Sequence, residues 1–261
     1  MAPWRAYVTT PMKLSFVIPA YNEEALLRPC VHSVMEQLAQ EGIDAEIIVV
    51  NNASTDRTRE VAASLAGVRV VDEPQKGLVR ARQAGFLAAT GDLIANIDAD
   101  TRLTPGWIAK VNRRFLRDPS LVALSGPCIY YDLSAPARVC ARLFYALAYV
   151  SYLTTRFVLN RSSLLQGGNY VIRRDALRAI GGYNTAIEFY GEDTDAAYRL
   201  HKIGKVVFTL RLPIYASGRR LAAEGVLTTG VTYILNYLWV VLFHKPFSKG
   251  YRDIRPPAPP A

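Results

Sequence analysis

Two aspartates spaced one residue apart are the residues of this chain with the clearest chemical potential. Asp98 and Asp100 directly follow residues 93–97, a mostly apolar run that predicts a short buried strand. In an open α/β sheet, ligands bind beyond the carboxyl ends of the strands. Carboxylate oxygens are hard ligands, and at that edge they suit Mg²⁺ or Mn²⁺ held against a diphosphate. By itself the pair fits a surface turn or a helix cap equally well, so the surrounding elements must decide.

The first half of the chain alternates strand and helix patterns. We expect strands at 14–18, 46–50, 68–71 and 93–97, and helices at 23–40, 55–65 and 77–89. Apolar, β-branched strands that alternate with helices predict a mostly parallel sheet sandwiched by helices, so the fold class is α/β. A further helix is expected after Pro105, with Thr104 as its N-cap.

The second half follows a different pattern. We expect a strand at 121–131, a long apolar helix or helix pair at 138–160, a loop at 166–169, strands at 170–174 and 206–210, and a helix at 191–203. The tail at 256–261 consists of Pro and Ala, which predicts disorder.

Residues 225–243 form an uncharged, largely apolar segment near the C-terminus. Its 19 residues approach the length that spans a bilayer, but threonines, glycines and Asn236 dilute the apolar character. The leucines, isoleucine and valines recur at helical spacing, which also fits a helix that packs on protein or lies on a membrane. Basic residues that could meet anionic headgroups follow at Lys245, Lys249, Arg252 and Arg255.

The composition bounds the class of protein. The chain has 261 residues, of which 51% are hydrophobic and 20% charged, so it can bury a substantial core. Its net charge of +9 suits a phosphorylated substrate, an anionic membrane or nucleic acid, but no nucleic-acid-binding module is recognisable. Three scattered cysteines indicate a reducing compartment rather than a disulfide framework. No signal peptide is visible in residues 1–10, and we expect the natural start at Met12.

Four further segments lie, like the aspartate pair, at strand ends or helix starts. They are 17–24 after the first strand, 51–56 after the second, 76–85 at the start of the third helix, and 191–200 at the start of a later helix. Together with Asp98 and Asp100, this order of motifs resembles the family-two glycosyltransferases, the large inverting class with the GT-A fold. The resemblance covers roughly residues 13–220. No glycine-rich dinucleotide or P-loop motif is present.

The resemblance implies a metal site at the aspartate pair. Asp98 and Asp100 match the family's DxD motif, in which the second carboxylate coordinates Mn²⁺ or Mg²⁺. The first contacts the ribose of the nucleotide sugar or completes the metal shell. The metal neutralises charge on the departing nucleoside diphosphate.

The resemblance also implies contacts to the nucleotide sugar. Residues from Pro19 through Tyr21 to Glu23 match a nucleotide-contact loop, although the same residues suit a strand-to-helix turn. Many family members have an aspartate at the position of Asn51. An amide there leaves the identity of the nucleotide base undetermined. UDP is the first choice, with GDP and dTDP as alternatives. A cation at Lys76 could meet the diphosphate, as could Arg80, or both could lie on a solvated helix face.

An acidic pair in the later helix implies the catalytic base. By resemblance, Asp193 takes the proton from the acceptor hydroxyl, while its neighbour Glu192 points about 100° away on the helix. Glu192, Asp195 and Arg199 share one helix face, and the last two form an i, i+4 ion pair. The alternative is that the acids only stabilise the helix N-terminus. Weaker expectations are a loop over the donor at 166–169 and diphosphate contacts from 219–220.

The combined prediction is an inverting glycosyltransferase. It would move a sugar from a nucleotide-diphosphate donor to a hydroxyl of a glycan or lipid-linked acceptor. Residues 13–120 would bind the donor, 121–220 would complete the acceptor and catalytic half, 221–250 would form a membrane-associated helix, and 251–261 a disordered tail. We expect a cytoplasmic protein, peripheral at the inner membrane face. The rivals are a catalytically inactive nucleotide-sugar binding or scaffold protein and a sugar-phosphate nucleotidyltransferase.

Overall fold

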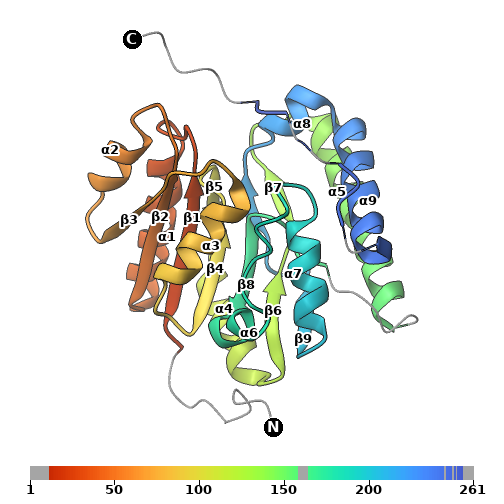
Figure 1. Ribbon diagram of the computed structural model, residues 1–261, viewed down its shortest axis with the longest axis horizontal. Coiled ribbons are helices and arrows are strands. Elements are labelled where there is room, and N and C mark those ends of the chain that lie inside the picture. The colour runs from red at the N-terminus through yellow and green to blue at the C-terminus, as the bar shows by residue number, and fades with distance from the viewer. Residues whose placement is uncertain (1–11, 158–163, 244, 249, 251, 255–261) are drawn as a thin grey trace.

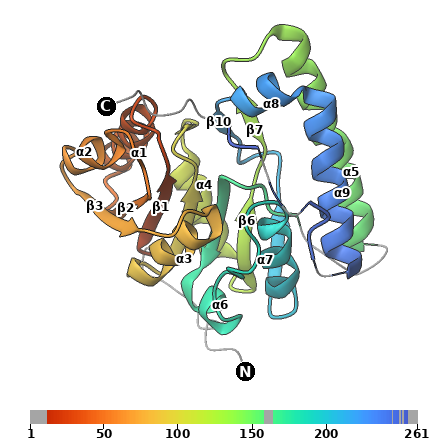
Figure 2. The ribbon, with the colours of Figure 1, turned by 45° about the horizontal axis from the view of Figure 1, so that its top comes forward.

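A computed structural model of the protein describes residues 12–157, 164–243, 245–248, 250 and 252–254. A central sheet carries helices on both faces, and two long helices lie side by side at one edge of the molecule (Figures 1 and 2). The expectations for the segment before Met12 and for the tail at 256–261 lie outside the described residues.

The first half forms the parallel part of the sheet, as predicted. Its elements are β1 (Leu14–Ala20), α1 (Leu27–Glu41), β2 (Ala45–Asn52), α2 (Thr58–Ala63), β3 (Val68–Glu73), α3 (Leu78–Ala88) and β4 (Leu93–Ile97). β1 lies between β2 and β4 and runs parallel to both. The carboxyl ends of β1, β2 and β4 therefore meet at one edge of the sheet.

The second half extends the same sheet. Its strands are β6 (Leu121–Ser125), β8 (Asn169–Arg173) and β9 (Lys205–Phe208), and the strand order is β3-β2-β1-β4-β8-β6-β9. β8 is antiparallel to both of its neighbours, while the other pairings are parallel. The α/β fold class with a mostly parallel sheet sandwiched by helices is confirmed.

The single strand predicted at 121–131 is wrong. It divides at Gly126 and Pro127 into β6 and β7 (Cys128–Tyr130), which belong to different sheets. Proline has no N–H for a strand ladder. At Gly126 the chain passes so close to the carbonyl of Leu212 that a Cβ would overlap it. β7 instead joins a three-stranded sheet with β5 (Thr101–Leu103) and β10 (Ile214–Ala216).

Two helix starts also differ from the prediction. The helix α4 (Trp107–Arg117) begins after Gly106, which adopts a left-handed φ of 68°. Thr104 does not cap it, because its hydroxyl donates to the carbonyl of Pro213 at 2.7 Å. The helix expected from residue 23 begins at Leu27, because the amide of Glu23 donates to the hydroxyl of Thr58 at 2.7 Å.

Alternation along the strands divides the core between the two faces of the sheet. Phe16 and Ile18 pack beneath α1 and α4 together with the buried Trp107. Val17 and Ile48 face the opposite layer, where α3, α6 (Arg174–Ala179) and α7 (Glu192–His201) cover the sheet. Because both faces are covered, the site at the carboxyl edge rests on a fully packed sheet.

The apolar segments predicted in the second half are helices. α5 (Ala135–Phe157) and α9 (Val226–Phe243) lie side by side, and the short helix α8 (Arg219–Glu224) leads into α9 (Figures 1 and 2). Among the residues described, no helix combines the length and the apolar character that crossing a membrane requires.

Candidate active site

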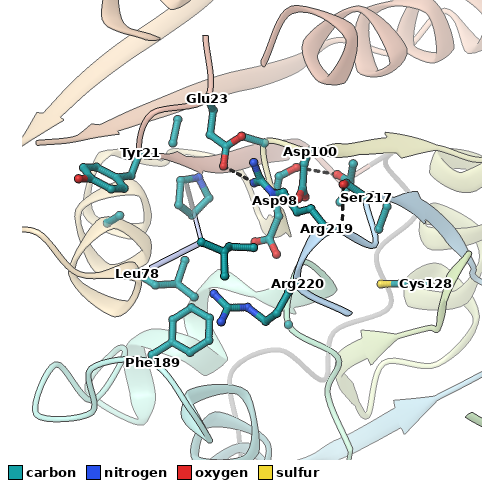
Figure 3. Close-up of a pocket in the computed structure, with 18 of the residues that line it drawn as sticks. Tyr21, Glu23, Leu78, Asp98, Asp100, Cys128, Phe189, Ser217, Arg219 and Arg220 are labelled. Carbon is teal, nitrogen blue, oxygen red and sulfur yellow. Dashed lines mark hydrogen bonds and ion pairs between the residues drawn. The ribbon is translucent and has the colours of Figure 1, made fainter. Parts of the chain in front are cut away.

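A cavity of about 180 Å³ lies at the carboxyl ends of the parallel strands. Loops after β1 and β4 form one side of it, and the start of α3 and the residues around α8 form the others (Figure 3). Its polar and charged lining residues include Glu23, Asn52, Lys76, Asp98, Asp100, Gln166, Ser217, Arg219 and Arg220. The cavity therefore brings carboxylates and cations from distant parts of the chain together.

Six of the residues predicted to bind metal or nucleotide sugar line this cavity. They are Pro19, Tyr21, Glu23, Lys76, Asp98 and Asp100. Asn51 is not among the lining residues; its side-chain nitrogen donates to Asp72 at 2.9 Å, and its oxygen is buried without a partner in the described part of the chain. The neighbouring Asn52 lines the cavity, and its oxygen accepts from the amide of Gly77 at 2.7 Å, which fixes the start of α3.

Each aspartate of the pair lies beside an arginine. An Nη2 of Arg82 is 3.1 Å from Asp98 Oδ1, and Nη2 of Arg219 is 3.0 Å from Asp100 Oδ2. Arg219 also pairs with the buried Glu23, so it connects the loop after β1 with the loop after β4 (Figure 3). These arginines lie against the carboxylates and balance their negative charge.

The aspartate pair has the ligand chemistry of a Mg²⁺ or Mn²⁺ site. Gly168, at a φ of 76°, leaves room for the Asp98 carboxylate, and a Cβ there would overlap it. No cluster of three or more His, Cys, Asp or Glu side chains with metal-binding geometry occurs among the described residues. Two carboxylates beside an open cavity fit a cation that takes its remaining oxygen ligands from a diphosphate and water.

Lys76 lies at the rim of the cavity. Its Nζ is 3.8 Å from the centre of the Tyr21 ring and 2.8 Å from Asp253. Burial lowers the pKa of Lys76, but hydrogen bonds to Asp253 and Tyr21 outweigh it and raise the pKa, so the amine stays charged. The Arg80 side chain is exposed and is not among the lining residues.

Arg82, a buried cation of the site, was not predicted from the sequence. Its side chain is 1% exposed and pairs with both Glu192 and Asp98. Its spacing in the sequence could have revealed its burial: on α3, Arg82 follows Val79 by three residues and precedes Phe86 by four, and both of these residues are buried. A charged residue on the buried face of a helix requires an ionic partner.

A second cavity of about 370 Å³ adjoins the first. The two share the lining residues Leu78, Asp98, Gln166, Gly167, Phe189 and Tyr233. Asp193, the predicted base, lines this second cavity and not the first. Of the predicted metal pair, Asp100 lines only the first cavity, whereas Asp98 lines both and so borders the cavity that contains the predicted base.

Backbone amides hold the Asp193 carboxylate. One oxygen accepts from the amide of Gly167 at 2.9 Å and the other from the amide of Thr194 at 2.7 Å. Burial raises the pKa of Asp193, while Arg82 and the two amides lower it. A carboxylate with a raised pKa is a better proton acceptor near neutral pH.

The remaining acids of α7 bind partners within the protein. Burial raises the pKa of Glu192, and Arg82 opposes this shift through an ion pair. Asp195 accepts from Arg199 at 2.8 Å, which confirms the predicted i, i+4 pair.

Comparisons with known proteins agree with this arrangement. The sequence model of glycosyl transferase family 2 matches residues 15–181. Chondroitin synthase of Pasteurella multocida is 33% identical over 121 residues, which are 45% of this chain and 12% of that protein. The probable glycosyltransferase YdaM of Bacillus subtilis is 25% identical over 213 residues, 77% of this chain and 49% of its own length. The chain thus spans half or less of these relatives.

Solved structures share the fold. The mannosyltransferase PcManGT from Pyrobaculum calidifontis, in complex with GDP-Man and Mn²⁺, has a TM-score of 0.63 at 19% identity and covers 84% of this chain and 63% of its own. Glucosyl-3-phosphoglycerate synthase of Mycobacterium tuberculosis, in complex with Mn²⁺, UDP-Glc and phosphoglyceric acid, has a TM-score of 0.56 at 21% identity, with coverages of 87% and 79%. With a family match over most of the sheet and the GT-A fold in these neighbours, the chain belongs to glycosyltransferase family 2.

Proposed function

We propose that this chain is an inverting, divalent-metal-assisted glycosyltransferase. It would transfer a sugar from a nucleotide-diphosphate donor to a hydroxyl of a glycan or lipid-linked acceptor, using residues 13–220. The observation that carries the proposal is the pair of adjoining cavities, with Asp100 in the first, Asp193 in the second and Asp98 lining both. Such an arrangement suits a donor and an acceptor that meet at one point.

The smaller cavity is the proposed donor site. Asp98 and Asp100 would hold Mn²⁺ or Mg²⁺, which when bound neutralises charge on the departing diphosphate. Lys76, Arg219 and Arg220 supply further positive charge around the same cavity. Complexes of structural neighbours with GDP-Man or UDP-Glc and Mn²⁺ support a nucleotide sugar. UDP stays the first choice of nucleotide, with GDP and dTDP open.

Asp193 is the proposed general base in the larger cavity. The acceptor oxygen would form a bond to the anomeric carbon while the bond from that carbon to the diphosphate breaks on the opposite side. The acceptor proton would pass to Asp193, which the amides of Gly167 and Thr194 hold in place. A single displacement of this kind inverts the anomeric configuration.

A donor panel tests the reaction. With Mn²⁺ present, UDP-, GDP- and dTDP-sugars are offered and the release of each nucleoside diphosphate is measured. We expect one nucleotide class to be turned over. A protein that binds a donor without ever releasing its diphosphate would instead support the inactive binding or scaffold alternative.

Single substitutions then separate the two cavities. Asp193→Asn should reduce transfer by at least 100-fold, in line with the loss of a general base, and leave donor binding unchanged. Asp100→Asn should weaken Mn²⁺-dependent donor binding. Asp44→Asn, an exposed aspartate in the loop before β2, is the matched control and should change neither. Transfer retained in Asp193→Asn would place the base elsewhere, and unchanged donor binding in Asp100→Asn would contradict the metal site.

A further inference from the structure

The larger cavity is predominantly apolar. Beyond Asp193 and its neighbours, it is lined from α5 by Phe144, Tyr145, Leu147, Ala148 and Tyr152, and from α9 by Tyr233, Ile234, Asn236, Tyr237 and Leu238. Three of these apolar residues are also strongly exposed: Leu147 by 71%, Ile234 by 46% and Leu238 by 44%. The cavity therefore opens to the exterior through an apolar mouth between the two helices.

The mouth lies within a larger apolar surface, which we name the outer face. It consists of two helical stripes, Val139, Leu143, Leu147 and Val150 on α5, and Leu227, Val231, Ile234 and Leu238 on α9, all exposed. The spacing of three and four residues places each stripe on one side of its helix. α5 and α9 pack where Gly230 meets the Phe144 ring, and Leu147 of one stripe lines the same cavity as Ile234 and Leu238 of the other, so the stripes meet at the mouth. Contiguous apolar patches of this kind mark membrane or protein interaction sites.

Charge and aromatic residues at the outer face favour a lipid surface. Neither α5 nor α9 contains an aspartate or glutamate, and Arg138 and Arg142 on α5 are exposed. At the end of α9, Trp239 contacts the half-exposed rings of Phe243 and Phe247, and the exposed Lys245 lies between those two in sequence. Aromatic rings and basic side chains together are typical of the interface of an anionic membrane.

We propose that the outer face lies on an anionic lipid leaflet and that the larger cavity takes the hydrocarbon chain of a lipid-linked acceptor. The chain would enter from the leaflet through the mouth at Leu147, and the acceptor hydroxyl would reach Asp193 at the other end of the cavity. An apolar chain that follows this route stays out of water throughout. The chemistry at Asp193 rests on the proposed glycosyl transfer, while the lipid surface and the chain site do not.

Two leucines of equal exposure test the outer face. Leu147→Glu places a charge at the mouth, and Leu87→Glu places the same charge on α3, away from α5 and α9 (Figure 1); the native side chains are 71% and 72% exposed. Flotation with vesicles of phosphatidylcholine and phosphatidylglycerol is the measurement. We expect wild-type protein, Leu87→Glu and the apolar variant Leu147→Met to float with the vesicles. The fraction of Leu147→Glu that floats should be at least fivefold smaller.

Two alanines of α5 test the cavity itself. Ala148→Trp would fill part of it, whereas Ala146→Trp adds the same ring at an exposed position of the same helix. The probe is 11-(dansylamino)undecanoic acid, whose fluorescence rises in an apolar site. We expect Ala148→Trp to lose at least tenfold in probe affinity, Ala146→Trp to keep it, and both variants to float with vesicles as wild type does.

The outcomes distinguish this inference from the proposed reaction. Equal flotation of Leu147→Glu and Leu87→Glu would overturn the lipid surface, as would a dimer in solution that Leu147→Glu dissociates, because a second copy would then cover the face. Equal probe binding by the two alanine variants would overturn the chain site. If the donor panel shows no turnover while these differences hold, the reaction fails and the lipid site stands.

Discussion

Arg219 lies beside Asp100, one of the two proposed metal ligands. Its guanidinium pairs with Asp100 and with the buried Glu23, and Glu23, Asp100 and Asp98 together hold its pKa well above the ordinary value despite burial. We predict that Arg219→Ala binds Mn²⁺ several-fold more tightly in the absence of nucleotide, because a competing positive charge 3.0 Å from Asp100 is removed. Donor affinity should fall, since the same arginine lines the donor cavity.

Electron paramagnetic resonance of free Mn²⁺ measures the first effect, and nucleotide titration measures the second. Arg57→Ala is the control, because the Arg57 side chain is 82% exposed and its ion-pair partner, Glu24, is not among the residues that line the cavity. Mn²⁺ affinity that is the same in Arg219→Ala and wild type would show that the arginine does not compete with the metal.

Arg82 pairs with Glu192, the neighbour of Asp193 on α7, and does not line the proposed donor cavity. We predict that Arg82→Met lowers the free energy of unfolding by about 3–5 kcal/mol, because it leaves Glu192 buried without its cation. Burial already raises the pKa of Glu192 in the folded protein from its ordinary 4.5 to about 8, and without Arg82 this pKa rises further. The folded protein then holds a proton that the unfolded chain releases, so the stability of Arg82→Met should decline as pH rises from about 4.5.

Urea unfolding across this pH range measures the change. Arg80→Met, an exposed position on the same helix, is the control and should change stability little. Adding Glu192→Gln to Arg82→Met should remove the decline with pH. In a transfer assay of Arg82→Met, the acidic limb of kcat/KM should move to higher pH, because Arg82 lowers the pKa of Asp193. An acidic limb at the same pH in Arg82→Met and wild type would show that Arg82 does not influence the pKa of the proposed base.

The acidic residues of the site were easier to predict from the sequence than its basic residues. Asp98 and Asp100 follow a strand end and Asp193 opens a helix, and the resemblance to family-two glycosyltransferases then marked all three as site residues. Arg80 and Arg82 look alike in the sequence, and only the phase of α3 against the sheet buries the second. Choosing Arg82 over Arg80 as the buried arginine required knowing that Val79 and Phe86 face the core.

At the scale of elements, the loop before β8 positions the Asp98 carboxylate. We predict that Gly168→Ala costs about 1–3 kcal/mol of stability, because its φ of 76° disfavours a side chain, and also weakens Mn²⁺-dependent donor binding, because the new Cβ overlaps Asp98. Gly42→Ala at the end of α1 is the matched control: its φ is 61° but no atom lies within 4 Å of a Cβ there. Thermal unfolding and donor titration should show similar strain in both and loss of binding only in Gly168→Ala.

The buried parallel strands were predictable because β-branched runs alternate with helices along the chain. The sheet of β5, β7 and β10 was not, because its strands have only three residues each and pair across long sequence separations. The pairing of β5 with β10 in that small sheet brings Ser217 beside Asp100, and the Ser217 amide donates to the Asp100 carbonyl at 3.2 Å. Local pattern therefore predicted the strand ends that border the proposed donor cavity, whereas non-local pairing placed Arg219 beside them.

At the scale of the whole molecule, the packed sheet and the pair α5 and α9 have different physical tasks. The sheet is covered on both faces and fixes the carboxylates, whereas α5 and α9 leave one apolar face uncovered. A net charge of +9 adds a long-range attraction to anionic surfaces. Attraction by charge and insertion of apolar side chains differ in their response to salt, so the two contributions to lipid binding are separable.

We predict that binding to anionic vesicles weakens as NaCl rises but does not vanish. The Debye length falls from about 10 Å at 0.1 M salt to about 3 Å at 1 M, which screens the net charge of +9 but leaves apolar insertion intact. Wild-type protein should retain a salt-resistant fraction in flotation at 1 M NaCl, and Leu147→Glu should retain none. Neutral phosphatidylcholine vesicles should bind only this apolar fraction at any salt concentration. Complete release of wild-type protein at high salt would show that charge alone draws the chain to lipid and that the outer face does not insert.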